Sequence, residues 1–253
     1  MIKLEKHLKI KTGYTLKHSK IPRIICIIPA RQGSKGLRQK NLRLVGGFTL
    51  VNRAIRVARS IEEPVYIILS SDCELILTKY KKKVDKCIKR KTELSTDNSL
   101  ITDVIKDALQ DLTDFHDDDI VMLLEPSSPN RTTSDLSNSI RVMVERNYSS
   151  ITTVSLVDAK YHPYKLLKST HNSHLTPFLT DSPIISNRQE IKEKAFYRNG
   201  LVYLYRLSIA KKLDKSLPNE TNFIVTNRKV SNIDNIFDLW LARYFDLRRF
   251  FKL

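Results

Sequence analysis

One short segment combines glycines with positive charge, the two features that a phosphate-binding loop requires. It reads Pro29-Ala-Arg-Gln-Gly-Ser-Lys-Gly36, and Leu37-Arg-Gln-Lys-Asn41 follows directly. Gly33 and Gly36 would let the backbone approach a ligand without an intervening Cβ atom. Neighbouring N–H groups in such a loop can form a nest that binds an anion. The segment therefore predicts a phosphate site.

Three cationic side chains in this loop, Arg31, Lys35 and Lys40, would add full charges to the nest. An arginine can hold two phosphate oxygens at once. The alternative interpretation is a solvated connection between a strand and a helix. The loop has neither the G-x-x-x-x-G-K-[ST] spacing of a Walker A motif nor the G-x-G-x-x-G spacing of a Rossmann dinucleotide site. Any phosphate binding would therefore be of another kind.

Alternating strand-like and helix-like segments must position this loop. Residues 23–30 (RIICIIPA) form a β-branched apolar run that suits a buried parallel strand and leads into the loop. The βαβα order predicts an α/β fold, with a mostly parallel twisted sheet and helices on both faces. Ligands of such folds bind at the carboxyl ends of the strands. The expected strands are 23–30, 65–71, 120–124, 150–157 and 201–206, and the expected helices are 50–60, 101–109, 134–144 (capped by Ser134) and 236–251.

The alternation weakens between residues 158 and 194, where polar residues are frequent and three prolines occur. We expect an excursion from the main sheet there. A chain of 253 residues suits one large domain with a small appendage. We therefore divide it into a basic N-terminal extension (1–22) and one domain (23–253) that includes the excursion.

The chain carries a formal net charge of +17, which attracts polyanions in general. Its basic residues are spread along the sequence without zinc-finger spacing or an RNA-binding aromatic signature. A nucleic-acid partner is therefore disfavoured but not excluded, and a solvated basic surface is the alternative. The apolar run Ile24–Ala30 is too short to span a bilayer, the N-terminus lacks a secretory signal, and three cysteines suit free thiols. We expect a cytoplasmic protein with no membrane partner.

A family resemblance follows from the loop and from later motifs. The segment IIPARQGSKGLRQKN resembles the N-terminal signature of the acylneuraminate cytidylyltransferases, which are Rossmann-like nucleotidyltransferases. The later motifs occur in the family's order, and the resemblance covers roughly residues 23–245. These motifs are Ser70-Ser-Asp72, Arg90-Lys-Thr-Glu-Leu94 with Ser95-Thr-Asp-Asn-Ser99, Leu124-Glu-Pro-Ser-Ser-Pro-Asn-Arg-Thr132, His162-Pro163, Asn187-Arg-Gln189, Arg198-Asn-Gly200, and Ser231-Asn-Ile-Asp234 with Asp238.

The resemblance implies an enzyme that joins CTP to a nine-carbon, sialic-acid-type (nonulosonic) sugar acid and releases pyrophosphate. Catalysis would consist mainly of positioning two anions and neutralising charge. Mg²⁺ would be the cofactor, with Asp234 and Asp72 as its ligands. From the residues alone, the N-cap of the last helix would be the favoured interpretation of Asp234. The implied catalytic residues are Arg31, Lys40 and Asp234, and the implied nucleotide-binding residues are Ala30, Gly33, Ser34, Lys35, Gly36, Asn41, Arg90, Ser99 and Glu125.

The sugar acid is expected near the excursion and the strand that follows it. Arg188 could pair with a carboxylate in bidentate fashion, although a surface arginine is the alternative. His162, next to a proline, is expected to fix a turn rather than to act as a base. The resemblance also implies a homodimer with the excursion at its interface. The implied sugar-binding residues are Arg188, Gln189, Tyr197 and Asn199.

Two positions depart from the family pattern. Glu125 stands where the family usually has glutamine, and its carboxylate could accept a hydrogen bond from cytosine but would repel phosphate. Asn232 replaces an aspartate and should weaken a metal site. Two alternatives therefore stay open: a related nucleotidyltransferase with another base or another nonulosonate, and a catalytically weak member that binds nucleotide or an anionic partner.

Overall fold

A seven-stranded sheet forms the centre of the protein. The structure is a computed structural model that describes residues 22–170, 174–180 and 188–251. All but the last residue of the expected N-terminal extension lies outside the described residues. The strand order is β11-β7-β10-β6-β1-β4-β5. Every neighbouring pair is parallel except the two that involve β10. The predicted mostly parallel sheet is confirmed. Its strands are β1 (Ile24–Pro29), β4 (Val65–Ser71), β5 (Lys86–Lys89), β6 (Ile120–Leu123), β7 (Ser150–Leu156), β10 (Phe196–Arg206) and β11 (Asn222–Val225).

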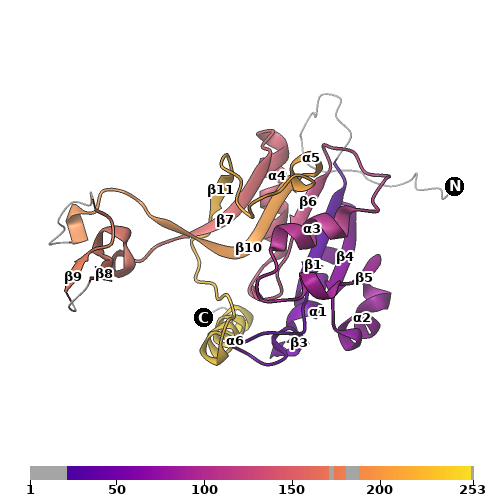
Figure 1. Ribbon diagram of the computed structural model, residues 1–253, viewed down its shortest axis with the longest axis horizontal. Coiled ribbons are helices and arrows are strands. Elements are labelled where there is room, and N and C mark those ends of the chain that lie inside the picture. The colour runs from indigo at the N-terminus through magenta and orange to yellow at the C-terminus, as the bar shows by residue number, and fades with distance from the viewer. Residues whose placement is uncertain (1–21, 171–173, 181–187, 252–253) are drawn as a thin grey trace.

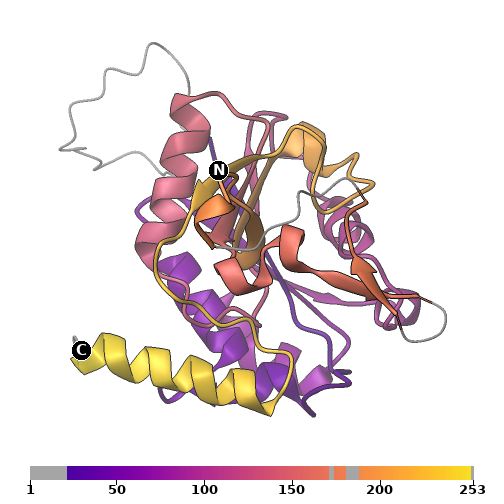
Figure 2. The same ribbon diagram turned by 90° about the vertical axis from the view of Figure 1, so that its left-hand side faces the viewer.

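Helices cover both faces of this sheet, as predicted (Figure 2). Side chains alternate along β1, so Ile24, Cys26 and Ile28 pack in one hydrophobic cluster, whereas Ile25 and Ile27 pack in another. The first cluster includes residues from α1, α2 and α4, and the second includes residues from α3 and α5. These helices are α1 (Leu50–Arg59), α2 (Glu74–Tyr80), α3 (Ile101–Leu109), α4 (Thr133–Glu145) and α5 (Leu207–Ala210).

The N-cap of α4 differs from the prediction. Thr132, not Ser134, caps this helix: its hydroxyl accepts a hydrogen bond from the backbone N–H of Asp135 at 3.1 Å. The Asp135 carboxylate in turn accepts one from the backbone N–H of Thr132 at 2.7 Å. This reciprocal capping box satisfies two backbone donors. Ser134 cannot be the N-cap, because it is already the second residue of the helix.

A third, smaller cluster joins the loop after β1 to the end of the chain. It contains Leu37 from the loop, Val45 from the β2 (Leu44–Val45)–β3 (Phe48–Thr49) hairpin, and Ile233 with Leu239 from the C-terminal segment. The last helix, α6 (Ile236–Phe251), has the predicted bounds. The cluster holds residues 231–235, which we call the closing segment, against the phosphate loop.

The excursion forms an arm that extends away from the sheet (Figure 1). Between β7 and β10 the chain makes 3-10 turns and a short hairpin of β8 (Leu167–Ser169) and β9 (Leu175–Pro177). Several large apolar side chains of the described arm residues are more than half exposed, among them Leu167, Leu175 and Phe178. The strand that returns from the arm, β10, begins at Phe196 and thus earlier than the predicted residue 201.

Candidate active site

The phosphate loop is anchored to the end of the neighbouring strand β4. The backbone N–H of Ala30 donates to the carbonyl of Ser70 at 2.8 Å, and the Ser71 hydroxyl donates to the carbonyl of Ala30 at 2.6 Å. Two residues after Ala30, the N–H of Gln32 donates to the Asp72 carboxylate at 2.7 Å. The predicted site residues Ala30 and Asp72 are therefore brought together at the carboxyl edge of the sheet, where such folds bind ligands.

Two cations of the loop converge on one carboxylate. Arg31 and Lys35 each lie 2.8 Å from a different oxygen of Asp97, which belongs to the segment before α3. Hydrogen bonds from Lys35 and, to a smaller extent, from Arg31 lower the pKa of the Asp97 carboxyl group. The two cations thus already hold an anion between them. Ser34 lies between them in the loop and is half-buried.

Lys40 and Gly36 hold the closing segment in place. The Lys40 ammonium donates to the carbonyl of Ile233 at 2.8 Å and lies 3.2 Å from the Asp234 carboxylate. A Cβ atom on Gly36 would lie only 2.1 Å from the Asp234 carbonyl oxygen, so this close backbone approach requires glycine. Gly33, by contrast, has nothing within 4 Å of its Cβ position.

The structure corrects the alternative interpretation of Asp234 as the cap of the last helix. Asn235 serves there instead, because its side-chain oxygen accepts the N–H of Asp238 at 3.0 Å. The Asp238 carboxylate reciprocally accepts the N–H of Asp234 at 2.9 Å and that of Asn235 at 3.0 Å. The Asp234 side chain is 76% exposed and stays available beside Lys40.

Arg90 forms the buried end of the site. Its guanidinium donates to the carbonyl of Ser70 at 2.9 Å and to the Ser70 hydroxyl at 3.2 Å. Burial lowers the pKa of this guanidinium, and the nearby Asp72 carboxylate opposes that effect. The amide of Asn41 donates to the carbonyl of Arg31 at 2.8 Å, and the Ser99 hydroxyl donates to the carbonyl of Glu93 at 2.7 Å.

One cleft of about 220 Å³ is lined by six of the predicted nucleotide and catalytic residues. These residues come from the segments that follow β1, β5 and β6 in the main sheet. The six are Arg31, Lys40, Asn41, Arg90, Ser99 and Glu125.

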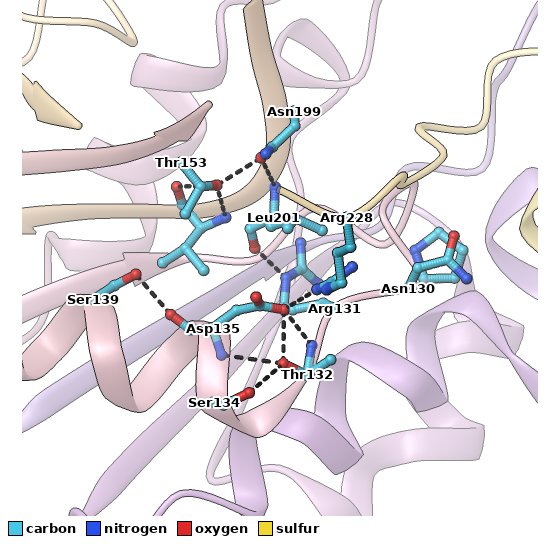
Figure 3. A network of polar contacts seen from close by, with 12 residues as sticks. Asn130, Arg131, Thr132, Ser134, Asp135, Ser139, Thr153, Asn199, Leu201 and Arg228 are labelled. Atoms are coloured by element: carbon cyan, nitrogen blue, oxygen red, sulfur yellow. Dashed lines mark hydrogen bonds and ion pairs between the residues drawn. The ribbon is translucent and has the colours of Figure 1, made fainter. Parts of the chain in front are cut away.

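Arg131 supports the site, although no role was predicted for it. It belongs to the motif that runs from Leu124 to Thr132. It is 5% exposed, and its guanidinium donates to the carbonyl oxygens of Glu125 and Gly200. It also donates to the carbonyl oxygen of Leu201 (Figure 3). Burial lowers the pKa of Arg131 to about 10. The side chain ties the loop after β6 to the kinked part of β10, so it fixes the backbone at Glu125. This role of Arg131 follows from the pairing of β6 with β10 and leaves no signal in the local sequence.

The residues predicted to bind the sugar are less closely gathered. Both polar groups of the Asn199 amide are engaged internally: its oxygen accepts from Thr153 at 2.7 Å, and its nitrogen donates to Ser155 at 3.0 Å. Tyr197, at the start of β10, is 49% exposed. Gln189 is exposed on the arm, and the Arg188 side chain lies outside the described residues.

His162 fixes a turn, as expected. Its Nδ1 accepts the N–H of Tyr164 at 3.4 Å, its Nε2 lies 3.2 Å from the carbonyl oxygen of Glu193, and the ring is 5% exposed. It joins the two ends of the arm, because Tyr164 and Glu193 lie on opposite sides of the β8–β9 hairpin in the chain.

The carboxylates near the loop could contribute to a magnesium site but do not complete one. Among the described residues, no group of three or more His, Cys, Asp or Glu side chains is placed to hold a metal. Mg²⁺ in nucleotide sites needs only one or two carboxylates, because phosphate oxygens and water fill the remaining positions. The carboxylates of Asp72 and Asp234 are of the ligand type that Mg²⁺ prefers, and each contacts a residue of the loop, Gln32 and Lys40 respectively. The Asn232 side-chain oxygen lies 3.5 Å from the Ser128 hydroxyl, at the limit of a hydrogen bond.

The fold and the loop define an α/β domain with a cleft at the carboxyl edge of its sheet, lined by Arg31, Lys40 and Arg90 among others. The sequence profile of the family described as Cytidylyltransferase matches residues 25–246, and the chain belongs to this family. In the described part of the chain, no helix is long and apolar enough to cross a membrane.

Individual relatives agree with this placement. The chain is 30% identical over 184 residues to the N-acylneuraminate cytidylyltransferase of Streptococcus agalactiae serotype V, an alignment that covers 71% of this chain and 42% of that protein. The chain thus spans less than half the length of the first curated relatives that it matches. The CMP-N,N'-diacetyllegionaminic acid synthase of Legionella pneumophila is 28% identical over 220 residues, covering 78% of this chain and 92% of that protein.

A solved structure supports the fold. The CMP:2-keto-3-deoxy-manno-octonic acid synthetase, determined in complex with CTP, superposes with a TM-score of 0.66 at 17% identity. The superposition covers 90% of this chain and 99% of that one. The likeness places this chain's sheet and helices in the same fold.

Proposed function

We propose that this protein activates a nonulosonic, sialic-acid-type sugar acid with CTP, giving the CMP-sugar and pyrophosphate. The observation that carries the proposal is the convergence of Arg31 and Lys35 on a single anion, Asp97, at the loop of a cytidylyltransferase-family chain. The activities named for the Streptococcus and Legionella relatives support the choice of acceptor.

In this proposal the triphosphate of CTP takes the place of the Asp97 carboxylate. Arg31 holds two oxygens, and Lys35 and Lys40 add charge on either side. The anomeric hydroxyl of the sugar attacks the α-phosphorus, a new P–O bond forms, and the bond to the β-phosphate breaks as pyrophosphate leaves. The hydroxyl proton passes to solvent. Because the reactants are anions, positioning and charge neutralisation supply most of the rate enhancement.

Asp234 and Asp72 are proposed to hold Mg²⁺ together with phosphate oxygens and water. The ion, when bound, neutralises charge on the phosphates. Asp234 owes its position to Lys40 and to the close approach at Gly36. Arg188, Gln189 and Tyr197 are proposed to contact the sugar acid from the arm and from the strand that follows it.

A homodimer is part of the proposal, with the arm at its interface. A two-stranded hairpin is marginally stable by itself, and this one leaves Leu167, Leu175 and Phe178 more than half exposed. Burial of these side chains against a second copy would stabilise the arm. Sedimentation at micromolar concentration should therefore give the mass of two chains; one chain at every concentration would contradict the dimer.

Nucleotide-dependent thermal stabilisation tests the nucleotide half of the proposal. CTP with Mg²⁺ should raise Tm, whereas UTP, ATP and GTP should not do so to the same extent. Arg31→Ala should abolish most of the CTP shift, because it removes the cation that holds two phosphate oxygens. Arg141→Ala, which breaks an exposed ion pair on α4, is the control and should retain the full shift. Equal stabilisation by all four nucleotides would contradict a CTP site.

A further inference from the structure

We propose that the outward face of α6 binds the surface of an anionic lipid bilayer. The helix would lie in the plane of the interface, with its apolar side chains at the boundary between headgroups and acyl chains. The expectation of no membrane partner rested on the lack of a spanning segment and of a secretory signal, neither of which interfacial binding requires. The residues concerned do not line the cleft of the candidate active site, so this inference does not depend on the proposed function.

Helix α6 is apolar on two opposite faces. Its inner face packs in the third cluster through Leu239 and Ala242. On its outer face, Phe237 is 75% exposed and Trp240 is 62% exposed, and their rings meet edge to face. A helix that is apolar all round is normally covered on every side. We call the exposed apolar side chains of this helix the α6 ridge: Ile236, Phe237, Trp240, Leu241, Tyr244 and Leu247.

The α6 ridge continues onto the β2–β3 hairpin. The Arg243 guanidinium donates to the carbonyl of Leu44 at 3.0 Å, which holds the hairpin beside the helix. Leu44 is half exposed, and Phe48 on the second strand of the hairpin is also exposed. Figure 2 shows α6 along one edge of the molecule, where an extended surface can reach it. A contiguous exposed apolar surface of this kind marks an interaction site.

The surface beside the α6 ridge is cationic. Arg43 and Arg243 are exposed, and the Arg56 guanidinium lies 4.3 Å from the centre of the Phe48 ring. The sequence has no Asp or Glu from residue 24 to residue 61, a stretch that includes the hairpin and α1. Basic residues next to an apolar surface strengthen its attraction to anionic lipid headgroups.

The acidic residues of α6 do not offset this positive charge. The carboxylate of Asp238 accepts backbone N–H groups at the start of the helix. Asp246 pairs with Arg53 of α1, on the side of α6 that packs against the domain. Both carboxylates are therefore engaged within the protein. An exposed apolar face and a positive border are the two attractions that peripheral membrane binding combines.

Two other partners fit this surface less well. In a two-fold interface the same surface of each copy meets, so the arginines beside the α6 ridge would face their own copies, and like charges repel. Single-stranded nucleic acid is held in a positively charged groove with aromatic platforms. The α6 ridge is instead the convex side of a helix, and half of its side chains are aliphatic. A lipid surface takes up aliphatic and aromatic side chains alike.

Tryptophan fluorescence tests the proposal directly, because Trp240 is the single tryptophan of the chain. Without lipid, its emission should be that of a solvent-exposed indole. Vesicles of phosphatidylcholine and phosphatidylglycerol at a ratio of about two to one should shift the emission to shorter wavelength and should carry the full chain into the pellet on centrifugation. Vesicles of phosphatidylcholine alone should bind at least about tenfold more weakly.

Two pairs of variants separate the α6 ridge from the net charge of the chain. Phe237→Gln should weaken partitioning into the mixed vesicles by about tenfold, whereas Leu100→Gln, at an exposed leucine that precedes α3, should leave it unchanged. Arg56→Glu should weaken partitioning by about fivefold or more, whereas Lys106→Glu on α3 should change it by about twofold at most. None of the four side chains is buried, so each variant should keep the wild-type Tm.

Any one of several results would overturn the proposal. Blue-shifted emission of Trp240 before lipid is added would show that the α6 ridge is already covered within the protein or its dimer. No binding to the mixed vesicles would exclude the lipid surface, and equal losses for the two charge reversals would show that net charge alone drives binding. A shift caused by single-stranded RNA but not by vesicles would assign the surface to nucleic acid. A fall in mass from two chains to one in Phe237→Gln would assign it to contact between copies.

Discussion

The two glycines of the phosphate loop are predicted to respond oppositely to the same substitution. Gly36→Ala places a Cβ atom 2.1 Å from the Asp234 carbonyl oxygen, and the contact is with backbone, which cannot rotate away. An ordinary contact of about 3.5 Å would require the closing segment to withdraw by about 1.4 Å. Gly33→Ala places its Cβ atom in open space.

The expected energies follow from these distances. Overpacking of this kind costs about 1–3 kcal/mol. Neither glycine has a positive φ, so alanine gains about 0.4–1 kcal/mol at both positions by restricting the unfolded chain. The midpoints of these two ranges leave a net loss of about 1.3 kcal/mol for Gly36→Ala, which lowers Tm by about 3–5 °C in a chain of this size. Gly33→Ala should keep or slightly raise Tm.

Thermal unfolding and CTP titration of both variants measure these effects. Gly36→Ala should lose both stability and CTP affinity, since Asp234 and Lys40 move with the closing segment. Gly33→Ala should lose CTP affinity alone, because its methyl group would occupy the space through which the phosphates approach. A wild-type Tm and wild-type CTP binding in Gly36→Ala would refute the reasoning, and so would equal Tm losses in both variants.

Three further predictions concern charged groups. Asp97→Asn should tighten CTP binding several-fold, as measured by calorimetry, because Arg31 and Lys35 no longer hold a competing anion. Asp111→Asn, which removes an exposed ion pair, is the control. Weaker CTP binding by Asp97→Asn would contradict the replacement of the Asp97 carboxylate by the triphosphate. Arg131→Met should cost about 3 kcal/mol in urea unfolding, because it leaves buried carbonyl oxygens unpaired; a loss below about 1 kcal/mol would show that water replaces the guanidinium. Burial opposes ionisation of Asp119, but N–H donors of His116 and Arg23 outweigh it and lower its pKa. Asp119→Asn should therefore be less stable than the wild type at neutral pH. The difference should begin to shrink as the pH falls below about 4 and should vanish below the lowered pKa of Asp119 in the folded protein. A difference independent of pH would be the contrary result.

Elements with strong apolar periodicity were predictable from the sequence. β4, α3 and α6 have the expected bounds. β5 was not predicted, because its sequence KCIK carries lysines, which suit an edge strand. Within the described residues, β5 pairs only with β4 and forms one edge of the sheet. The early start of β10 was also missed, since its pairing with β7 shifts register between Arg198 and Tyr203.

The candidate site was predictable where its residues are neighbours in the chain. The loop residues Arg31, Lys35 and Lys40 were found because glycine and charge are dense there. Asp97 was not predicted to be their partner. Its two ion pairs join residues that lie 66 and 62 positions apart, so local sequence spacing does not indicate them. The same holds for Arg131, whose burial and carbonyl partners depend on the pairing of β6 with β10.

Pyrophosphate release tests the central claim most directly. The wild-type protein is incubated with Mg²⁺, CTP and a panel of nonulosonic acids, with each substrate omitted in turn. The account predicts pyrophosphate only when CTP and one of the acids are both present, with an equal amount of CMP-sugar formed. No release with any acid, from a protein that CTP stabilises, would contradict it.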